Sequence, residues 1–111
     1  MATVYFDKLW CHFPQDPENK DEIYLSFEAD GGKANYTSTY TNMTKDVSVD
    51  FWHGFEFKEY GVIKIWEDDP PGNASDLLGE QLVTAIPGDY TSGKFINHGS
   101  WYSLNYDVVL S

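Results

Sequence analysis

A chain of 111 residues is long enough for one domain with one hydrophobic core and too short for two. Its 18 Asp and Glu residues stand against only seven basic residues, all of them Lys, and the formal net charge of −11 at pH 7 argues against nucleic-acid binding, because it repels a phosphate backbone. A hydrophobic share of 41% is too high for a disordered acidic tail, and no apolar run approaches the ~20 residues of a transmembrane helix. We predict one folded domain over residues 1–111.

The single cysteine, Cys11, excludes an internal disulfide, and the sequence around it has no zinc-site spacing. Asp7 lies where a secretory signal peptide would have its apolar centre, so no leader is visible. The cytoplasm is therefore the default compartment, and secretion stays an open alternative.

Alternation of apolar and polar residues predicts strands along most of the chain. The alternation is clearest in four segments, which are 22–29, 47–57, 62–66 and 101–109. Strands also fit four further segments, which are 3–13, 34–41, 79–85 and 92–97. Turn residues separate these segments, and none shows a helical stripe. We predict an all-β fold, an antiparallel β-sandwich of seven or eight strands.

Successive turns of such a fold alternate between the two ends of the sandwich, so the first, third and fifth turns share one end. These turns cover residues 14–22, 42–46 and 67–76. They hold nine of the 18 acidic residues, which are Asp16, Glu18, Asp21, Glu22, Asp46, Glu67, Asp68, Asp69 and Asp76. Half of the negative charge is therefore expected at one rim.

Crowded carboxylates call for a counterion or for solvation. Two like charges 4 Å apart repel by about 4 kcal/mol at an effective dielectric of ~20. Ca²⁺ is the natural counterion, since it takes 6–8 oxygen ligands and tolerates irregular loops. Glu67 and Asp69 lie two residues apart and point the same way, and Asp76 brings a third carboxylate just before the next strand. The alternative is a solvated acidic face.

The first acidic turn resembles a calcium loop of the C2 domain, the calcium- and lipid-binding β-sandwich of protein kinase C and synaptotagmin. That loop reads Asp-x5-Asp-Pro-Tyr in the family. Here Asp16 and Glu22 keep the six-residue step, and Tyr24 keeps the tyrosine. The resemblance implies a C2-like sandwich, non-enzymatic, with calcium at one end.

The fifth turn resembles the other calcium loop of that family, Asp-x-Asp-x5-Asp-x-x-Gly after an apolar strand. Here the acidic residues and the glycine follow the same plan with one extra residue between Asp69 and Asp76. The resemblance implies a set of calcium ligands, with Asp21 as a substitute for Glu22: Asp16, Glu22, Glu67, Asp69 and Asp76. The family's basic patch for phosphoinositides has no counterpart, so calcium binding is better supported than docking to a membrane surface.

Exposed aromatic residues support an alternative function. Trp52, Trp66 and Trp101 fall on the outward phase of their predicted strands, and exposed rings on a β-sandwich can stack on sugars beside a structural calcium. The alternative is therefore a lectin-like, carbohydrate-binding sandwich. His53 falls on the inward phase of 47–57, so we expect a hydrogen-bonded core residue rather than a ligand.

The sequence carries no motif of a known catalytic site, neither a nucleophile elbow, a His-Glu-x-x-His segment nor a phosphate-binding glycine loop. We therefore predict a binding module and no enzyme. Calcium is its expected ligand, and a membrane surface, a protein and a glycan stay open as partners, as does the oligomeric state.

Overall fold

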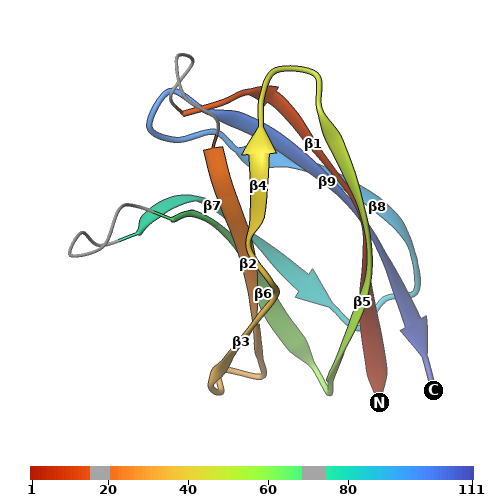
Figure 1. Ribbon diagram of the computed structural model, residues 1–111. Coiled ribbons are helices and arrows are strands. Elements are labelled where there is room, and N and C mark those ends of the chain that lie inside the picture. Colours follow the sequence, from red (N-terminus) through yellow and green to blue (C-terminus); the bar gives the residue numbers. More distant parts are fainter. Residues whose placement is uncertain (16–20, 69–74) are drawn as a thin grey trace.

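The computed structural model describes residues 1–15, 21–68 and 75–111. Within these ranges the chain forms nine strands and no helix (Figure 1). Their bounds are β1 Ala2–Phe13, β2 Asp21–Ala29, β3 Ala34–Tyr36, β4 Tyr40–Met43, β5 Ser48–Phe57, β6 Tyr60–Glu67, β7 Asp76–Thr84, β8 Gly88–Phe95 and β9 Trp101–Leu110. Since the described part of the chain is helix-free, it offers no helix that could cross a membrane.

The strands form two antiparallel sheets that pack face to face. The first sheet has the order β5-β1-β9-β8. The second has the order β3-β2-β6-β7, and β4 pairs with β2 as well. Figure 1 shows the two layers crossing, with both chain termini at the lower end of the first sheet. The predicted all-β antiparallel sandwich is confirmed.

The segment predicted as one strand over 34–41 is two strands, β3 and β4, and both pair with β2. The reason lies at Thr37, whose side-chain hydroxyl replaces a backbone carbonyl in the hydrogen bonds to β2. The Thr37 N–H donates to the Leu25 carbonyl at 2.9 Å, and the Leu25 N–H donates to the Thr37 hydroxyl at 3.0 Å instead of to a backbone carbonyl. The regular ladder therefore stops there and resumes at Tyr40.

The core lies between the sheets and is built from the predicted inward faces. In β9, Tyr102 and Leu104 are buried, while the neighbouring Trp101 and Ser103 point outward. Twenty described hydrophobic residues are buried: Ala2, Val4, Phe6, Leu9, Cys11, Ile23, Leu25, Phe27, Met43, Phe51, Phe57, Ile63, Ile65, Leu78, Val83, Phe95, Tyr102, Leu104, Tyr106 and Val108. Burial of this apolar area is the main favourable contribution to folding.

The prediction that His53 is a core residue is wrong, because the side chain is exposed. The register of β5 on β1 shifts at this point. Phe6 pairs with His53, whereas Lys8, two residues further along β1, pairs with Asp50, three residues back along β5. His53 still pairs with the buried Phe6 and so keeps the inward phase of β5, but β5 is an edge strand of its sheet, and there its side chain reaches solvent.

Asp30 organises the end of the sandwich opposite the predicted calcium loops. Its carboxylate accepts the backbone N–H groups of Lys58 at 2.8 Å, Glu59 at 2.7 Å and Tyr60 at 3.2 Å. These hydrogen bonds hold the pKa of the Asp30 carboxyl below its usual value. The turn between β5 and β6 therefore uses a carboxylate as its acceptor, and this acidic residue needs no cation.

Gly61 lets β6 approach the aromatic core closely. A Cβ at this position would lie 2.0 Å from Cζ of Phe27, whose ring is fixed by contacts with Phe6, Phe55 and Phe57. We expect Gly61→Ala to lower the free energy of unfolding by about 1–3 kcal/mol through overpacking, measured by urea denaturation. The control is Gly93→Ala, whose added Cβ would meet Trp101 Nε1 at an ordinary 3.7 Å. Equal losses in the two variants would contradict this account.

Candidate functional site

The strand ends that flank the first and fifth loops lie side by side at one end of the second sheet. Glu67, the last residue of β6, pairs with Ile23 in β2 and with Asp76 in β7. The Glu22 N–H donates to Oε2 of Glu67 at 2.8 Å. In return, the Asp68 N–H donates to the Glu22 carbonyl at 2.7 Å. Three of the predicted ligands, Glu22, Glu67 and Asp76, therefore lie on adjacent strands at the same end.

The third loop reaches the same end, as the alternation of turns predicts. Met43, at the end of β4, pairs with Asp21. The Asp46 N–H donates to the Cys11 carbonyl at 2.8 Å, which places this loop beside the end of β1. Figure 1 shows the β4–β5 connection at the upper end of the molecule, next to the end of β1 and the start of β2.

Two of the predicted calcium ligands, Asp16 and Asp69, lie outside the described residues, as does the side chain of Trp52. The described residues contain no group of three His, Cys, Asp or Glu side chains arranged to hold a metal ion. Glu67 and Asp76 pair directly with each other, and Glu67 also pairs with the buried Ile23, so these two side chains share the inward face. Glu22 adjoins Ile23 and is exposed on the opposite face at the same end. The three residues therefore do not form a complete metal site by themselves.

Asp21, named above as a substitute ligand for Glu22, links the two sheets. It lies on the inward phase of β2, only 1% exposed, and its Oδ2 accepts the Tyr102 hydroxyl at 2.5 Å and the Gln15 N–H at 2.7 Å. Because β2 and β9 belong to different sheets, this contact joins the two layers. Asp21 is therefore a buried acceptor that joins the two sheets.

The groups around Asp21 are held in their neutral forms. Burial and the hydrogen bond to Asp21 keep the pKa of Tyr102 far above its usual value. Burial also raises the pKa of the Cys11 thiol to about 11. At neutral pH the thiol is therefore protonated, so Cys11 provides neither a thiolate ligand nor a nucleophile.

Gln15 connects the buried Asp21 to the rim. Its Nε2 donates to Oδ2 of Asp76 at 2.6 Å, while its backbone N–H donates to Asp21. The carboxamide oxygen, Oε1, is buried and has no hydrogen-bond donor among the described residues. An oxygen left without a donor, on an amide whose nitrogen donates to the Asp76 carboxylate, fits a hard cation such as Ca²⁺, which binds carboxylate and amide oxygens.

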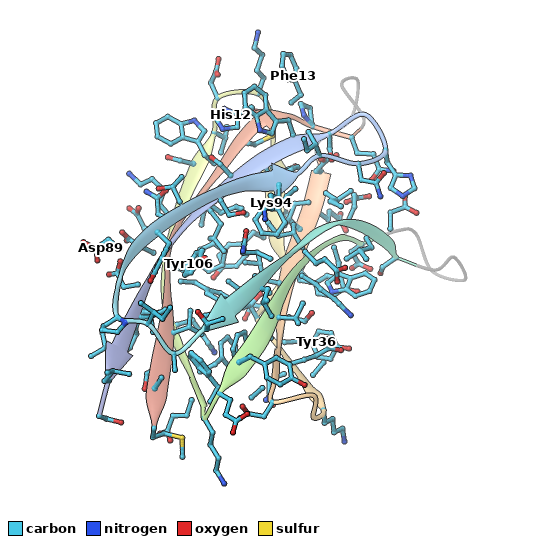
Figure 2. All side chains as sticks on the ribbon, turned by 180° about the vertical axis from the view of Figure 1, so that it is seen from behind. His12, Phe13, Tyr36, Asp89, Lys94 and Tyr106 are labelled. Atoms are coloured by element: carbon cyan, nitrogen blue, oxygen red, sulfur yellow. The ribbon has the colours of Figure 1, made fainter. Side chains whose placement is uncertain are left out.

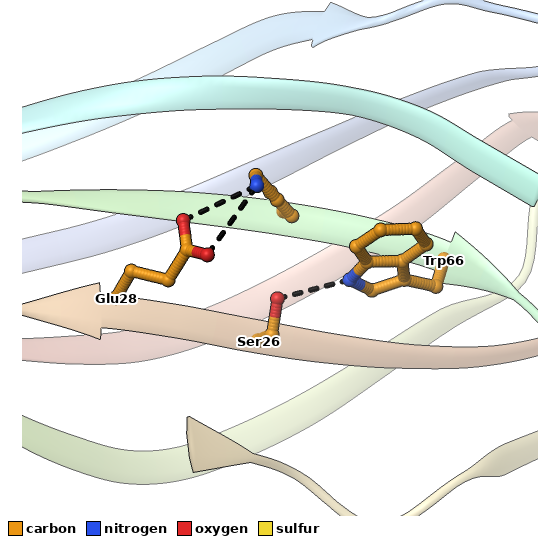
Figure 3. Close-up of polar contacts among 4 residues, drawn as sticks. Ser26, Glu28 and Trp66 are labelled. Carbon is orange, nitrogen blue, oxygen red and sulfur yellow. Dashed lines mark hydrogen bonds and ion pairs between the residues drawn. The ribbon is translucent and has the colours of Figure 1, made fainter. Parts of the chain in front are cut away.

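The structure separates the tryptophans proposed as a sugar platform. The indole N–H of Trp66 donates to the Ser26 hydroxyl at 2.9 Å, beside an ion pair of Lys64 and Glu28 at 3.2 Å (Figure 3). Its half-buried ring belongs to β6 in the second sheet, whereas the exposed ring of Trp101 belongs to β9 in the first. Trp66 and Trp101 therefore do not form one surface.

Trp101 instead belongs to an aromatic cluster of Trp10, His12, Phe13 and Trp101. The His12 ring lies 4.2 Å from the Trp101 ring and 6.2 Å from the Trp10 ring, and Phe13 lies 6.4 Å from Trp101, measured between centroids. His12 Nε2 lies 2.9 Å from the Ser103 hydroxyl, within hydrogen-bond distance. Figure 2 shows His12 and Phe13 at one end of the first sheet. The other three rings are between 41% and 48% exposed.

An acidic hollow lies on the same outer face of the first sheet. It has a volume of about 260 Å³ and is lined by Asp7, Asp89, Tyr90, Thr91, Asn105 and Asp107. Burial raises the pKa of the Asp107 carboxyl, and a hydrogen bond and repulsion from Asp89 and repulsion from Asp7 raise it further. Since Asp107 and Trp101 fall on the same outward phase of β9, the hollow and the aromatic cluster share one face.

The sequence alone did not point to Gln15, Trp10, His12 or the acidic hollow. Gln15 is neutral, so a search for acidic side chains passes over it. The outward phase of β9 does place Trp101 and Asp107 on one face, but their neighbours come from β1 and β8. Finding those neighbours requires the pairing of the strands, which alternation does not contain.

The sequence matches no protein-family model and no curated protein sequence. Solved structures do match over nearly the whole chain. The structure of a C2 domain aligns with a TM-score of 0.68 at 15% sequence identity, over 98% of this chain and 97% of that one. This chain has the fold of a C2 domain. The resemblance inferred from the two acidic loops is confirmed at the level of the fold.

Two further structures share the C2 fold. The C2A domain of plant Extended Synaptotagmin 1 aligns with a TM-score of 0.68 at 8% identity, over 96% of this chain and 90% of that one. CC2D1B, described as coordinating ESRCT-III activity during the mitotic reformation of the nuclear envelope, aligns with a TM-score of 0.70 at 10% identity over 98% of this chain. This chain spans only 54% of the CC2D1B chain. At these identities the likeness establishes the fold alone.

The contact between Tyr102 and Asp21 can be tested by removing one hydroxyl. We expect Tyr102→Phe to lower the free energy of unfolding by about 2 kcal/mol, because a buried carboxylate loses a donor. The measurement is urea denaturation at neutral pH. The control is Tyr90→Phe, which removes an exposed hydrogen bond of 2.7 Å to the Ile86 carbonyl and should cost less than about 1 kcal/mol. A Tyr102→Phe variant as stable as the wild type would contradict the structural role of Asp21.

Proposed function

We propose that this chain is a non-enzymatic binding module with a C2-like fold that holds Ca²⁺ between its first and fifth loops. The observation that carries the proposal is the set of hydrogen bonds and strand pairings that gathers Glu22, Glu67 and Asp76 at one end of the second sheet. The C2 fold of the chain supports the same assignment, since the fold brings these loops together.

The chemistry of the donors favours calcium over a transition metal. Carboxylates of Glu22, Glu67 and Asp76 would hold the ion, joined by Asp16 and Asp69 from outside the described residues. All of these donors are oxygens, which suits Ca²⁺, whereas zinc sites draw on Cys and His. Each bound Ca²⁺ would offset two of the 11 net negative charges. The bound ion would thereby relieve repulsion between loops and hold them together.

Calcium should stabilise the fold, and the variant Asp76→Asn should remove most of that effect. At a hundredfold excess over Kd, binding contributes about 2.7 kcal/mol, or a rise in Tm of roughly 10 °C. Asn keeps an oxygen that can accept the hydrogen bond from Gln15 but loses the charge that attracts the ion. The measurement is Tm in millimolar calcium and in EGTA. Asp69→Asn should behave like Asp76→Asn.

The matched control is Asp68→Asn, which removes the same charge from the same end. Its backbone N–H still donates to the Glu22 carbonyl, and its side chain points away from that of Glu67 because adjacent residues alternate. We expect this variant to keep the calcium effect. A wild-type Tm that is the same in calcium and in EGTA would overturn the proposal.

Vesicle sedimentation then separates the possible docking partners. If the calcium-loaded protein sediments with anionic phosphatidylserine vesicles and EGTA releases it, the partner is a membrane surface. If calcium raises Tm without vesicle binding, the partner is a protein or a glycan. The absence of Arg and the low number of Lys favour the second result, because a protein without a basic patch has little attraction for anionic lipid.

We propose carbohydrate binding as a second candidate function, based on the aromatic cluster. Its exposed rings of Trp10 and Trp101 offer the apolar faces that stack on sugar rings. The acidic hollow on the same face of the first sheet offers acceptors for sugar hydroxyls, among them Asn105 and Asp107. The net charge of −11 repels acidic polysaccharides, so the ligand class is a neutral glycan.

Retention on insoluble cellulose, chitin and xylan tests this second function. If the wild type is retained, we expect Trp101→Ala to weaken retention at least tenfold, because its ring contacts both His12 and Phe13. The control is Tyr36→Ala, which removes a 60% exposed ring from the other sheet. Lack of retention of the wild type, or equal retention by the Trp101 variant, would rule out a sugar platform at this cluster.

A further inference from the structure

Gln15 occupies a position that neither the acidic motifs nor the resemblance single out. It follows Pro14 after the end of β1, and it bridges the starts of two strands of the second sheet. Its backbone N–H donates to Asp21 in β2 at 2.7 Å, and its Nε2 donates to Asp76 in β7 at 2.6 Å. The backbone N–H and the side-chain amide of Gln15 thus tie the first loop to the fifth.

The acceptor of Gln15 is the unusual feature. Oε1 is buried and no described residue donates a hydrogen bond to it. A buried polar oxygen without a donor costs free energy, and nearly all such atoms in folded proteins have a partner. The Gln15 amide cannot gain by exchanging its two polar atoms, because the oxygen would then face the Asp76 carboxylate.

The surroundings of this oxygen favour a cation as the missing partner. The nitrogen and the oxygen of a carboxamide share one carbon, so Oε1 lies beside the Asp76 carboxylate to which Nε2 donates. The nearby Glu67 pairs directly with Asp76 across the strands. A hard cation would satisfy the amide oxygen and offset the carboxylates at the same time, since Ca²⁺ accepts both kinds of donor.

We propose that Gln15 is a ligand of the calcium ion and binds it through Oε1. This inference rests on the proposed calcium function and adds to it a neutral donor. Because its nitrogen holds Asp76 while its oxygen binds the ion, Gln15 both positions one carboxylate and contributes a ligand itself. The first loop is thereby coupled to the fifth through a single side chain.

Calorimetric titration of the full chain with CaCl₂ tests the role of Gln15. We expect Gln15→Leu, which keeps the size of the side chain and removes its oxygen, to raise Kd at least tenfold. The matched control is Gln81→Leu, the same change in β7 at an amide that bonds Ser92 and the Leu82 carbonyl. The control should bind calcium as the wild type does.

Gln15→Glu separates a ligand from a merely structural residue, and it remains informative if Gln15→Leu fails to fold. As a ligand, Glu still offers an oxygen to the ion and adds a charge, so its Kd should equal or fall below that of the wild type. Its Tm in EGTA should drop, because its carboxylate then faces Asp76 without a cation. If Gln15 is only a structural bridge, Kd should rise instead, because Glu cannot donate a hydrogen bond to Asp76 and calcium binding would weaken.

Each outcome bears on one of the two proposals. If the wild type binds calcium and Gln15→Leu binds it equally well, the role of Gln15 is overturned and the calcium function stands. If Gln15→Glu raises Kd, Gln15 is a bridge and not a ligand. If the wild type does not bind calcium, both proposals fail together.

Discussion

The contact on which the loop end depends is the hydrogen bond from the Tyr102 hydroxyl to the Asp21 carboxylate, because it joins the two sheets beneath the loops. A buried carboxylate is costly unless donors compensate for the lost water. Tyr102 from one sheet and the backbone of Gln15 from the first loop supply such donors. The buried Asp21 therefore fixes the position of Gln15, and Gln15 in turn fixes the position of Asp76.

The rest of the acidic surface is accommodated by several different means. Asp30 accepts backbone N–H groups, Glu28 pairs with Lys64, and Asp50 pairs with Lys8. With seven Lys for 18 acidic residues, such pairs cannot balance the charge. The surplus gathers at the loop end and in the acidic hollow. Repulsion at these two places is the physical reason that both are candidate sites for ligands that bring positive charge or hydroxyl donors.

Much of this arrangement follows from alternation, and the exceptions have identifiable causes. The inward phase of β2 extends back from Ile23 to Asp21, so the burial of Asp21 could have been predicted, and alternation in β9 places Tyr102 inward in the same way. The contact between these two residues could not have been predicted, because alternation does not say which strands pack against each other across the sandwich. His53 keeps the inward phase but is exposed, because β5 is an edge strand of its sheet. Trp66 and Trp101 share an outward phase but belong to different sheets.

A neutral amide is well suited to a site in a chain that is already so acidic. Every carboxylate added to the rim attracts a cation but also raises the repulsion that the apo protein must bear. An amide oxygen contributes a ligand without adding that repulsion. Its nitrogen can meanwhile donate to a neighbouring carboxylate, as Gln15 does to Asp76, and so stabilise the apo state as well. At the proposed site, Gln15 would therefore add a ligand with less repulsion in the apo protein than a sixth carboxylate would.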